Sequence, residues 1–217
     1  HEPKIENETS SGVSFIDALK SRTLWCLGIG SACLWFSIQG LNSQITIFFE
    51  QEAGYTAQQA VILFSTLFWF SFFGKFAFGA LSDKIPKQRV FLITSCILFI
   101  GSLLLFEINN GQLSFTQNRA QLTIFTILFG LGYGGSFSMI QLVALEIFGK
   151  AYLGRILGLI TLVDGMGAAL GTKLLSELKI STGSYFVPFA LVSLVTFFAI
   201  INVFLIKPIQ TKSQTPS

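Results

Sequence analysis

The sequence predicts an all-α membrane protein in which six transmembrane helices form one bundle. Of its 217 residues, 52% are hydrophobic and only 12% are charged, whereas soluble domains usually carry about 25% charged residues. So few charges do not cover a water-facing surface of this size, and we therefore expect lipid to cover much of the apolar excess. The charges also separate six apolar stretches, each close to the roughly 20 residues that cross a bilayer as a helix.

The six stretches follow one another with short polar breaks between them. Residues 1–23 are expected to form a cytoplasmic lead-in whose first 13 or so residues are polar, acidic and disordered. Residues 24–206 then form the transmembrane bundle, and residues 207–217 form a polar tail. The stretches run from about Leu24 to Phe49, Gln58 to Leu81, Val90 to Phe106, Leu122 to Leu145, Arg155 to Leu175 and Tyr185 to Ile206.

The cations favour one side of this layout. Ten of the 14 Lys and Arg residues fall on the side that holds both termini, three fall on the other side, and Lys75 lies inside a span. Positive residues are enriched in cytoplasmic loops. The sequence therefore predicts a multi-pass protein of the plasma (inner) membrane with both ends of this segment in the cytoplasm.

The composition argues against several other classes of protein. The one His is residue 1, and the three cysteines lie in apolar stretches without a ligand spacing, so we expect no metal site and no cofactor. The net charge of +3 comes from scattered cations, which does not indicate binding to nucleic acid. No catalytic His or serine-elbow pattern is present, so we do not expect an enzyme.

Two charged residues fall well inside the spans. Lys75 lies eight residues before Asp83, and Asp164 lies nine residues after Arg155; at 1.5 Å per residue these spacings place them roughly 12 and 14 Å from the same membrane face. A charge at that depth is costly unless it is paired or hydrated. The two could pair directly, or Lys75 could bind a substrate anion while Asp164 exchanges a proton. Alternatively, Lys75 snorkels to the interface and Asp164 makes a structural hydrogen bond.

Uncharged polar residues and glycines within the spans indicate where helices contact one another or a solute. The amides and hydroxyls of the first and fourth spans are candidates either for substrate contact or for hydrogen bonds between helices: Gln39, Asn42, Ser43 and Gln141. Glycine pairs at i,i+4 spacing permit close approach of helices in lipid: Gly130 with Gly134, Gly154 with Gly158, and Gly167 with Gly171.

A loop motif follows the second stretch, from Gly79 to Arg89. It resembles the signature loop of the major facilitator superfamily, GxLaDrxGrkxxl, with Pro86 in place of the second glycine. The matching residues are Gly79, Leu81, Asp83, Lys84, Lys87 and Arg89. Residues 14–25, 146–158 and 182–185 also resemble segments of monocarboxylate- and oxalate-type porters of that superfamily.

The resemblance covers residues 14–206 and matches the C-terminal half of such porters. It implies helices 7 to 12 of a twelve-helix protein, with a 3+3 inverted repeat and a missing N-terminal six-helix half. In carboxylate porters a cation four residues before the motif glycine engages the substrate carboxylate, and Lys75 has this position. Oxalate-type porters carry a second cation where this chain has Asp164, a departure that weakens a dicarboxylate substrate.

The resemblance also implies roles for the remaining polar residues. The helices that carry Gln39, Asn42, Ser43 and Gln141 line the central cavity of the family. The signature loop is expected to act in gating, through contacts of Asp83 or Glu146 with Arg155 or with a helix N-terminus. The alternative for these three residues is a solvated charge cluster of little energetic weight.

Together these observations predict a secondary active transporter, a symporter or antiporter, for a small organic anion such as a monocarboxylate, with or without a coupled proton. Its expected partners are the solute, protons, the lipid bilayer and the missing six-helix half. The alternative is a non-transporting, receptor-like or assembly subunit built on the same half-fold, because one half alone does not enclose the usual cavity between two halves.

Overall fold

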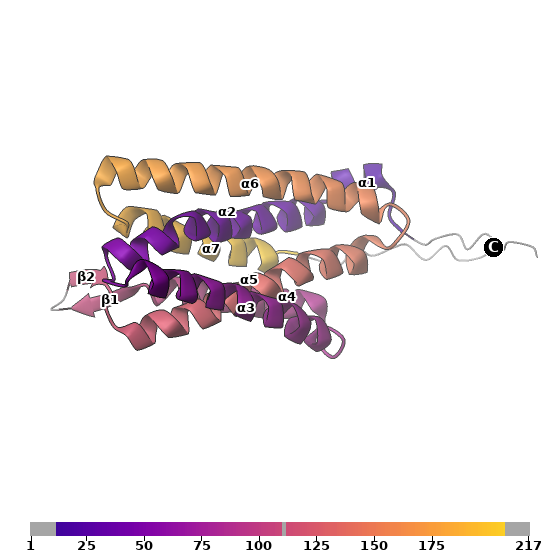
Figure 1. Ribbon diagram of the computed structural model, residues 1–217. Helices are drawn as coiled ribbons and strands as arrows, with labels where there is room; N and C mark the ends of the chain where they lie inside the picture. The colour runs from indigo at the N-terminus through magenta and orange to yellow at the C-terminus, as the bar shows by residue number, and fades with distance from the viewer. Residues whose placement is uncertain (1–11, 110–111, 207–217) are drawn as a thin grey trace, which may run out of the picture.

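The computed structural model describes residues 12–109 and 112–206 (Figure 1). Within this part of the chain, seven helices and one β-hairpin follow one another in the order α1 (Phe15–Lys20), α2 (Arg22–Gln51), α3 (Ala57–Leu81), α4 (Lys87–Leu103), β1 (Phe106–Asn109), β2 (Gln112–Phe115), α5 (Arg119–Phe148), α6 (Leu153–Thr182) and α7 (Phe186–Phe204). The predicted helical architecture is confirmed, and each of the six predicted stretches coincides with one of the helices α2 to α7.

Five helices, α2, α3, α5, α6 and α7, are long and apolar enough to cross a membrane. Helix α4 has 17 residues, which span about 26 Å at 1.5 Å per residue, slightly less than the hydrocarbon thickness of a typical bilayer. The sixth crossing therefore stays a prediction. The tail at 207–217 and lead-in residues 1–11 lie outside the described residues.

The hairpin was not predicted. The third stretch was expected to continue to Phe106, but α4 ends at Leu103, and Phe106 opens β1 and pairs with Phe115 of β2. The sequence Asn110-Gly111 is a strong hairpin-turn signal, but it lies in the break between the third and fourth stretches, which was read only as a connection between spans. The side chain of Gln121 donates hydrogen bonds to the carbonyl oxygens of Leu104 (2.9 Å) and Phe106 (3.1 Å) and so anchors the start of the hairpin.

Aromatic contacts seal the hairpin against the bundle. The ring of Phe115 stacks with Phe106 and meets Phe48 of α2 edge-on, with ring centroids 5.6 and 5.0 Å apart. Phe48 in turn contacts Phe189 of α7 at 5.1 Å. Such edge-to-face contacts add to the energy of apolar burial, so the hairpin closes one end of the helix bundle.

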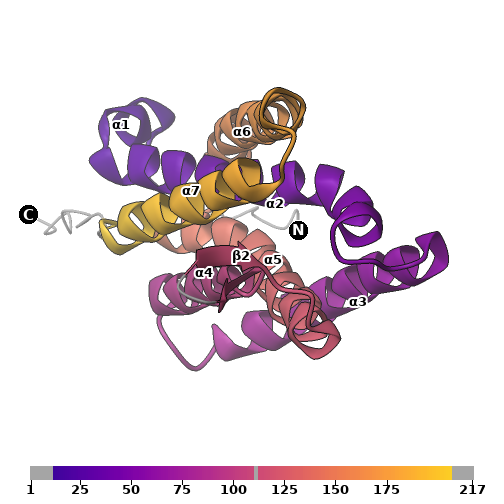
Figure 2. The same cartoon turned by 90° about the vertical axis from the view of Figure 1, so that its left-hand side faces the viewer.

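The helices associate mainly as two pairs, α2 with α6 and α3 with α5. Figure 2 shows α2 and α6 on one side and α3, α4 and α5 on the other, with α7 between them. Helix α4 packs on α5 and α7, and α7 also packs on α2. The bundle is thus built from two pairs joined by α4 and α7.

Two of the three predicted glycine pairs form the closest helix contacts. A Cβ atom added at Gly130 or Gly134 would overlap the carbonyl oxygens of Leu67 or Ser71 in α3, and one added at Gly167 or Gly171 would overlap those of Ala32 or Phe36 in α2. Here only glycine permits the observed approach of two backbones. The third pair, Gly154 with Gly158, contacts no other helix within the described part of the chain.

Helices α3 and α6 are the least buried of the long helices. In each, 17% of the most apolar 18-residue window is buried. Their exposed large side chains include Phe68, Trp69, Phe72, Phe73 and Phe76 on α3 and Leu162, Met166 and Leu170 on α6. An apolar surface of this extent is typical of contact with lipid or with another protein segment.

The lead-in joins the bundle at the end opposite the hairpin. Figure 1 places α1, the α3–α4 connection and the α5–α6 connection together at this end. The backbone N–H of Val13 donates to the carbonyl oxygen of Phe148 (2.9 Å), and Gly12 forms a β-bridge with Gly149. The expectation of disorder was therefore wrong for residues 12 and 13. The polar composition of the lead-in did not reveal that its backbone pairs with the turn after α5.

Candidate functional site

A cavity of about 240 Å³ lies between α2, α5 and α6. Three of the six predicted substrate-binding residues line it, namely Gln39, Gln141 and Asp164. The remaining wall residues are aromatic, apolar or small: Trp35, Phe137, Ile140, Leu157, Ile160, Thr161, Gly165 and Ala168. The site therefore combines an apolar, aromatic wall with two amides and one carboxylate, as small-molecule sites commonly do.

Asp164 occupies the α6 wall of this cavity and is only 8% exposed. Its Oδ1 atom accepts a hydrogen bond of 2.5 Å from the hydroxyl of Ser31 on α2, and Ser31 is itself completely buried. A short hydrogen bond between a hydroxyl and a carboxylate is among the stronger contacts in proteins. The carboxylate is thus oriented by a hydrogen bond to the neighbouring helix. A structural hydrogen bond of this kind is one of the two alternatives that the sequence left open for Asp164.

Lys75 on α3 is half-buried, and its ammonium lies over the ring of Phe137, 4.5 Å from the ring centroid. Phe137 belongs to the cavity wall, and its ring meets Trp35 edge-on at 6.1 Å. A cation over an aromatic face is stabilised by the quadrupole of the ring. Lys75 is therefore connected to the cavity through Phe137 rather than by lining it directly.

Lys75 and Asp164 do not pair in this conformation. The ion pairs in the described part of the chain join Lys173 with Glu177 (3.8 Å) and Lys179 with Glu52 (3.5 Å). Of the alternatives open from the sequence, direct pairing of the two charges in the membrane is therefore not the arrangement observed. The two charges face different partners on different helices.

The structure does not bring Asn42 and Ser43 to the cavity wall. Ser43 is exposed, and its hydroxyl donates to the carbonyl oxygen of Gly40 within its own helix (2.7 Å). Both amide atoms of Asn42 are buried and have no hydrogen-bond partner among the described residues. An unsatisfied buried amide costs about 1–3 kcal/mol, so Asn42 retains bonding capacity for a partner outside the described chain.

The signature loop connects α3 to α4 in a tight turn. Ser82 caps the end of α3, with its hydroxyl donating to the carbonyl oxygen of Gly79 (2.6 Å). Pro86, which replaces the usual glycine, immediately precedes α4 and its carbonyl oxygen accepts from Arg89 N–H (2.8 Å). A proline at a helix start is compatible with the geometry there. Three charged residues of the loop project outward as exposed side chains: Asp83, Lys84 and Arg89.

The predicted gating charges do not contact one another in this conformation. Asp83, Glu146 and Arg155 are all exposed, and within the described residues none of them forms an ion pair. The Arg155 guanidinium, in the first turn of α6, lies 6.0 Å from the ring centroid of Tyr152, which directly precedes that helix. Lys87 is half-exposed at the start of α4.

Sequence reasoning missed the residues that orient the charged groups. Ser31 and Phe137 lie in apolar helices where hydroxyls and rings are common, and no local pattern distinguishes them. It also missed Gln88, inside the signature loop, whose side chain donates to the carbonyl oxygens of Ile206 (2.5 Å) and Val203 (3.3 Å). Gln88 thereby ties the loop to the end of α7.

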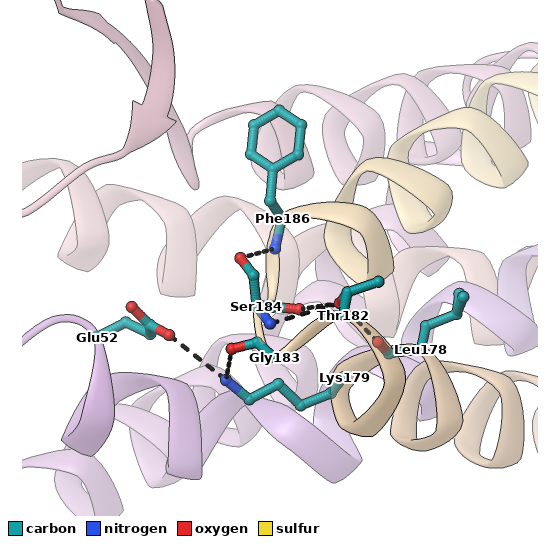
Figure 3. Close-up of polar contacts among 7 residues, drawn as sticks. All are labelled: Glu52, Leu178, Lys179, Thr182, Gly183, Ser184 and Phe186. Carbon is teal, nitrogen blue, oxygen red and sulfur yellow. Dashed lines mark hydrogen bonds and ion pairs between the residues drawn. The ribbon is translucent and has the colours of Figure 1, made fainter.

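A polar cluster joins α2 and α6 at the hairpin end (Figure 3). The ammonium of Lys179 lies 3.5 Å from a carboxylate oxygen of Glu52, donates to the carbonyl oxygen of Gly183 (3.2 Å) and lies 3.9 Å from the centroid of the Tyr185 ring. Thr182 donates to the carbonyl oxygen of Leu178 (2.6 Å). These contacts fix the α6–α7 turn, where Gly183 has a φ of 70°.

The chain is similar to known membrane transporters in sequence and fold. The family profile described as Major Facilitator Superfamily matches residues 12–217. An uncharacterized MFS-type transporter of Bacillus subtilis (strain 168), YfiU, is 33% identical over 107 residues, which are 49% of this chain and 19% of that protein. A putative niacin/nicotinamide transporter of the same organism, NiaP, is 28% identical over 127 residues, which are 58% of this chain and 30% of that protein.

The fold itself is shared with solved structures. The POT family transporter PepTSo has a TM-score of 0.72 at 18% identity, and the match covers 85% of this chain and 37% of that one. At this identity the likeness shows the fold alone. The chain thus spans less than a third of the length of these curated relatives and little more than a third of that solved structure.

The hydrogen bond between Ser31 and Asp164 predicts energetic coupling between α2 and α6. In a double-mutant cycle of Ser31→Ala and Asp164→Ala, we expect a coupling free energy of about 1 kcal/mol, in the range measured for residues in direct contact. The measurement is the free energy of unfolding in detergent. Ser37→Ala is the matched control, because Ser37 is a fully buried serine of the same helix that bonds to Val192 and not to Asp164. Coupling equal to that of the Ser37 cycle would contradict the contact.

Proposed function

The chain belongs to the major facilitator superfamily and is a multi-pass membrane protein, and we propose that it forms the C-terminal six-helix half of a secondary active transporter. In this proposal α4 supplies the sixth crossing, and α2–α4 and α5–α7 form the two three-helix repeats. The missing partner is an N-terminal six-helix half. Its proposed contact surface includes the exposed apolar faces of α3 and α6, which the rest of this chain leaves uncovered.

The proposed substrate is a small organic anion such as a monocarboxylate. The observation that carries this proposal is the ammonium of Lys75, which has no carboxylate partner among the described residues and lies 4.5 Å from a ring of the cavity wall. A half-buried cation within a membrane span is stabilised when an anion joins it, which favours binding of a solute carboxylate. The relative NiaP is named for niacin, a monocarboxylate, together with nicotinamide, its uncharged amide.

Asp164 is proposed as the proton-linked residue of the same site. Its carboxylate lies in the cavity wall, and its affinity for a proton depends on whether an anion occupies Lys75. Coupling of this kind between two ligands is reciprocal. A proton on Asp164 then favours the solute, and the solute favours the proton, which is the thermodynamic requirement for cotransport.

We further propose that the signature loop gates the cycle. Asp83, Glu146 and Arg155 are exposed and unpaired in the described conformer, so contacts among them would belong to a different conformer. Interactions made in only one of two states shift the equilibrium between them. The α3–α4 and α5–α6 connections lie at the same end of the bundle, as this role requires (Figure 1).

Removal of the lysine tests the substrate proposal. In the full-length gene product that carries this chain, Lys75→Gln should reduce carboxylate uptake at least about tenfold, because a hydrogen bond to a charged group contributes about 1.5–3 kcal/mol. Asp164→Asn should retain exchange but flatten the pH dependence of net uptake. Lys173→Gln is the control, since Lys173 is an exposed lysine on α6 paired with Glu177. Normal uptake by Lys75→Gln would mean that the lysine snorkels to the interface, and the anion assignment would be lost.

The gating proposal is tested at Asp83. We expect Asp83→Asn to slow the transport cycle more than it reduces membrane insertion or solute binding, because neutralising the carboxylate removes contacts of one conformer only. Uptake is compared at matched membrane abundance. Asp17→Asn, an exposed carboxylate of α1 at the same end of the bundle, serves as the control. Equal uptake by Asp83→Asn and the wild type would leave Asp83 as a solvated surface charge.

The proposed orientation places the signature loop in the cytoplasm, supported by the excess of cations on that side. Single cysteines introduced at two exposed loop positions, Gln117→Cys and Lys150→Cys, test it in a background without Cys26, Cys33 and Cys96. An impermeant thiol reagent added outside intact cells should label residue 117 and not residue 150. Labelling in the reverse pattern would invert the topology.

A further inference from the structure

Two opposite charges lie near one cavity without pairing. Asp164 in the wall bonds to Ser31, and Lys75 rests on Phe137 of the same wall. In a medium of low dielectric constant two such charges attract strongly. Each charge instead has its own uncharged partner: Asp164 accepts from the Ser31 hydroxyl of α2, and Lys75 lies over the Phe137 ring of α5.

The rest of the described cavity wall carries no further charge. Of the eleven residues that line it, Asp164 is the one with a charged side chain. Gln39 and Gln141 add amides, and Trp35 and Phe137 add aromatic rings. Together with the Lys75 ammonium over the ring of Phe137, the carboxylate gives the site a net charge of zero before any solute enters.

We propose that the solute of this site is a small zwitterion, an amino-carboxylate whose carboxylate binds Lys75, whose ammonium binds Asp164 and whose apolar body packs on Trp35 and Phe137. This inference rests on the proposed function and specifies its substrate class. The cavity of about 240 Å³ between α2, α5 and α6 has room for a solute the size of a single amino acid.

The net charge of the occupied site depends on which solute is bound. A monocarboxylate brings one negative charge, so the site regains neutrality only when a proton joins Asp164. A zwitterion brings no net charge, and its ammonium occupies the position that the proton otherwise takes. Because uncompensated charge is costly at this depth, the zwitterion is expected to move without the Asp164 proton, whereas a monocarboxylate moves with one.

Few other ionisable groups could supply that proton. Between their ends, the long helices packed on α6 contribute Cys26 and Cys33 from α2 and Tyr133 from α5, and α7 contributes none. The short helix α1, which also packs on α6, carries Asp17 and Lys20. The ring of Tyr133 lies 6.0 Å from that of Trp35. Beside Lys75, these are the groups that a pH-dependent measurement must distinguish from Asp164.

The test uses matched solutes that share one apolar body. Two series are phenylalanine, 3-phenylpropionate and phenethylamine, and leucine, 4-methylpentanoate and isopentylamine. Binding to the purified full-length gene product is measured by competition. Uptake and proton movement are followed in proteoliposomes with a trapped pH dye. We expect the zwitterion of at least one series to bind at least about tenfold more tightly than both of its singly charged analogues, and to enter without acidifying the lumen.

The variants assign the two contacts. Asp164→Asn should remove the preference for the zwitterion over the monocarboxylate, and Lys75→Gln should remove its preference over the amine. Asp164→Glu retains the charge and should retain the preference. Lys173→Gln is again the control, and thermal stability in detergent shows whether each variant is folded.

Each outcome separates this inference from the proposed function. A preference for the monocarboxylates in both series, lowered by Lys75→Gln, would overturn the zwitterion and leave the anion transporter standing. Zwitterion uptake accompanied by one proton would overturn the charge-balance mechanism. Failure of every carboxylate and zwitterion to bind the folded wild-type protein would overturn both.

Discussion

Direct contact between helix backbones at glycines is the constraint on which this structure depends. Gly167 and Gly171 lie against the carbonyl oxygens of α2, and Gly130 and Gly134 lie against those of α3. In lipid, where helices gain little from excluding water, such close packing is a main source of association. It produces two tight pairs, and the cavity lies where α2 and α6 of one pair face α5 of the other.

The same contacts position the charged groups. Asp164 lies one turn before Gly167, on the α6 surface that meets α2, which brings its carboxylate to Ser31. Lys75 directly follows Gly74, whose Cα faces the carbonyl oxygen of Leu131 on α5. Each of these two charges therefore lies beside a close contact between helix backbones, and neither is held by a partner charge. For the solute proposed above, positioning of this kind lowers the entropic cost of binding.

The sequence predicted what depends on composition and spacing along the chain. Apolar length located all six long helices, and the signature loop indicated the family. Charge in an apolar segment singled out Asp164, which does line the cavity together with Gln39 and Gln141. Contacts between distant segments were not predictable in this way. Phe137 is one of 24 phenylalanines, and only the fold reveals that its ring both contacts Lys75 and lines the cavity. Equal depth along two helices likewise did not specify whether Lys75 and Asp164 meet, because depth leaves the rotation of each helix undetermined.

The backbone pairing of the lead-in has a mechanical consequence. Gly12 and Val13 are bound to the turn between α5 and α6, and Gly149 in that turn has a φ of 73°, a conformation that few other residues adopt without strain. The segment entering α1 is therefore not a slack tether. A force on this segment therefore acts first on the turn between α5 and α6, next to the start of the helix that carries Asp164. It reaches α2 through α1. A displacement of the lead-in is thus transmitted to two places, the α5–α6 turn through these backbone contacts and α2 through α1.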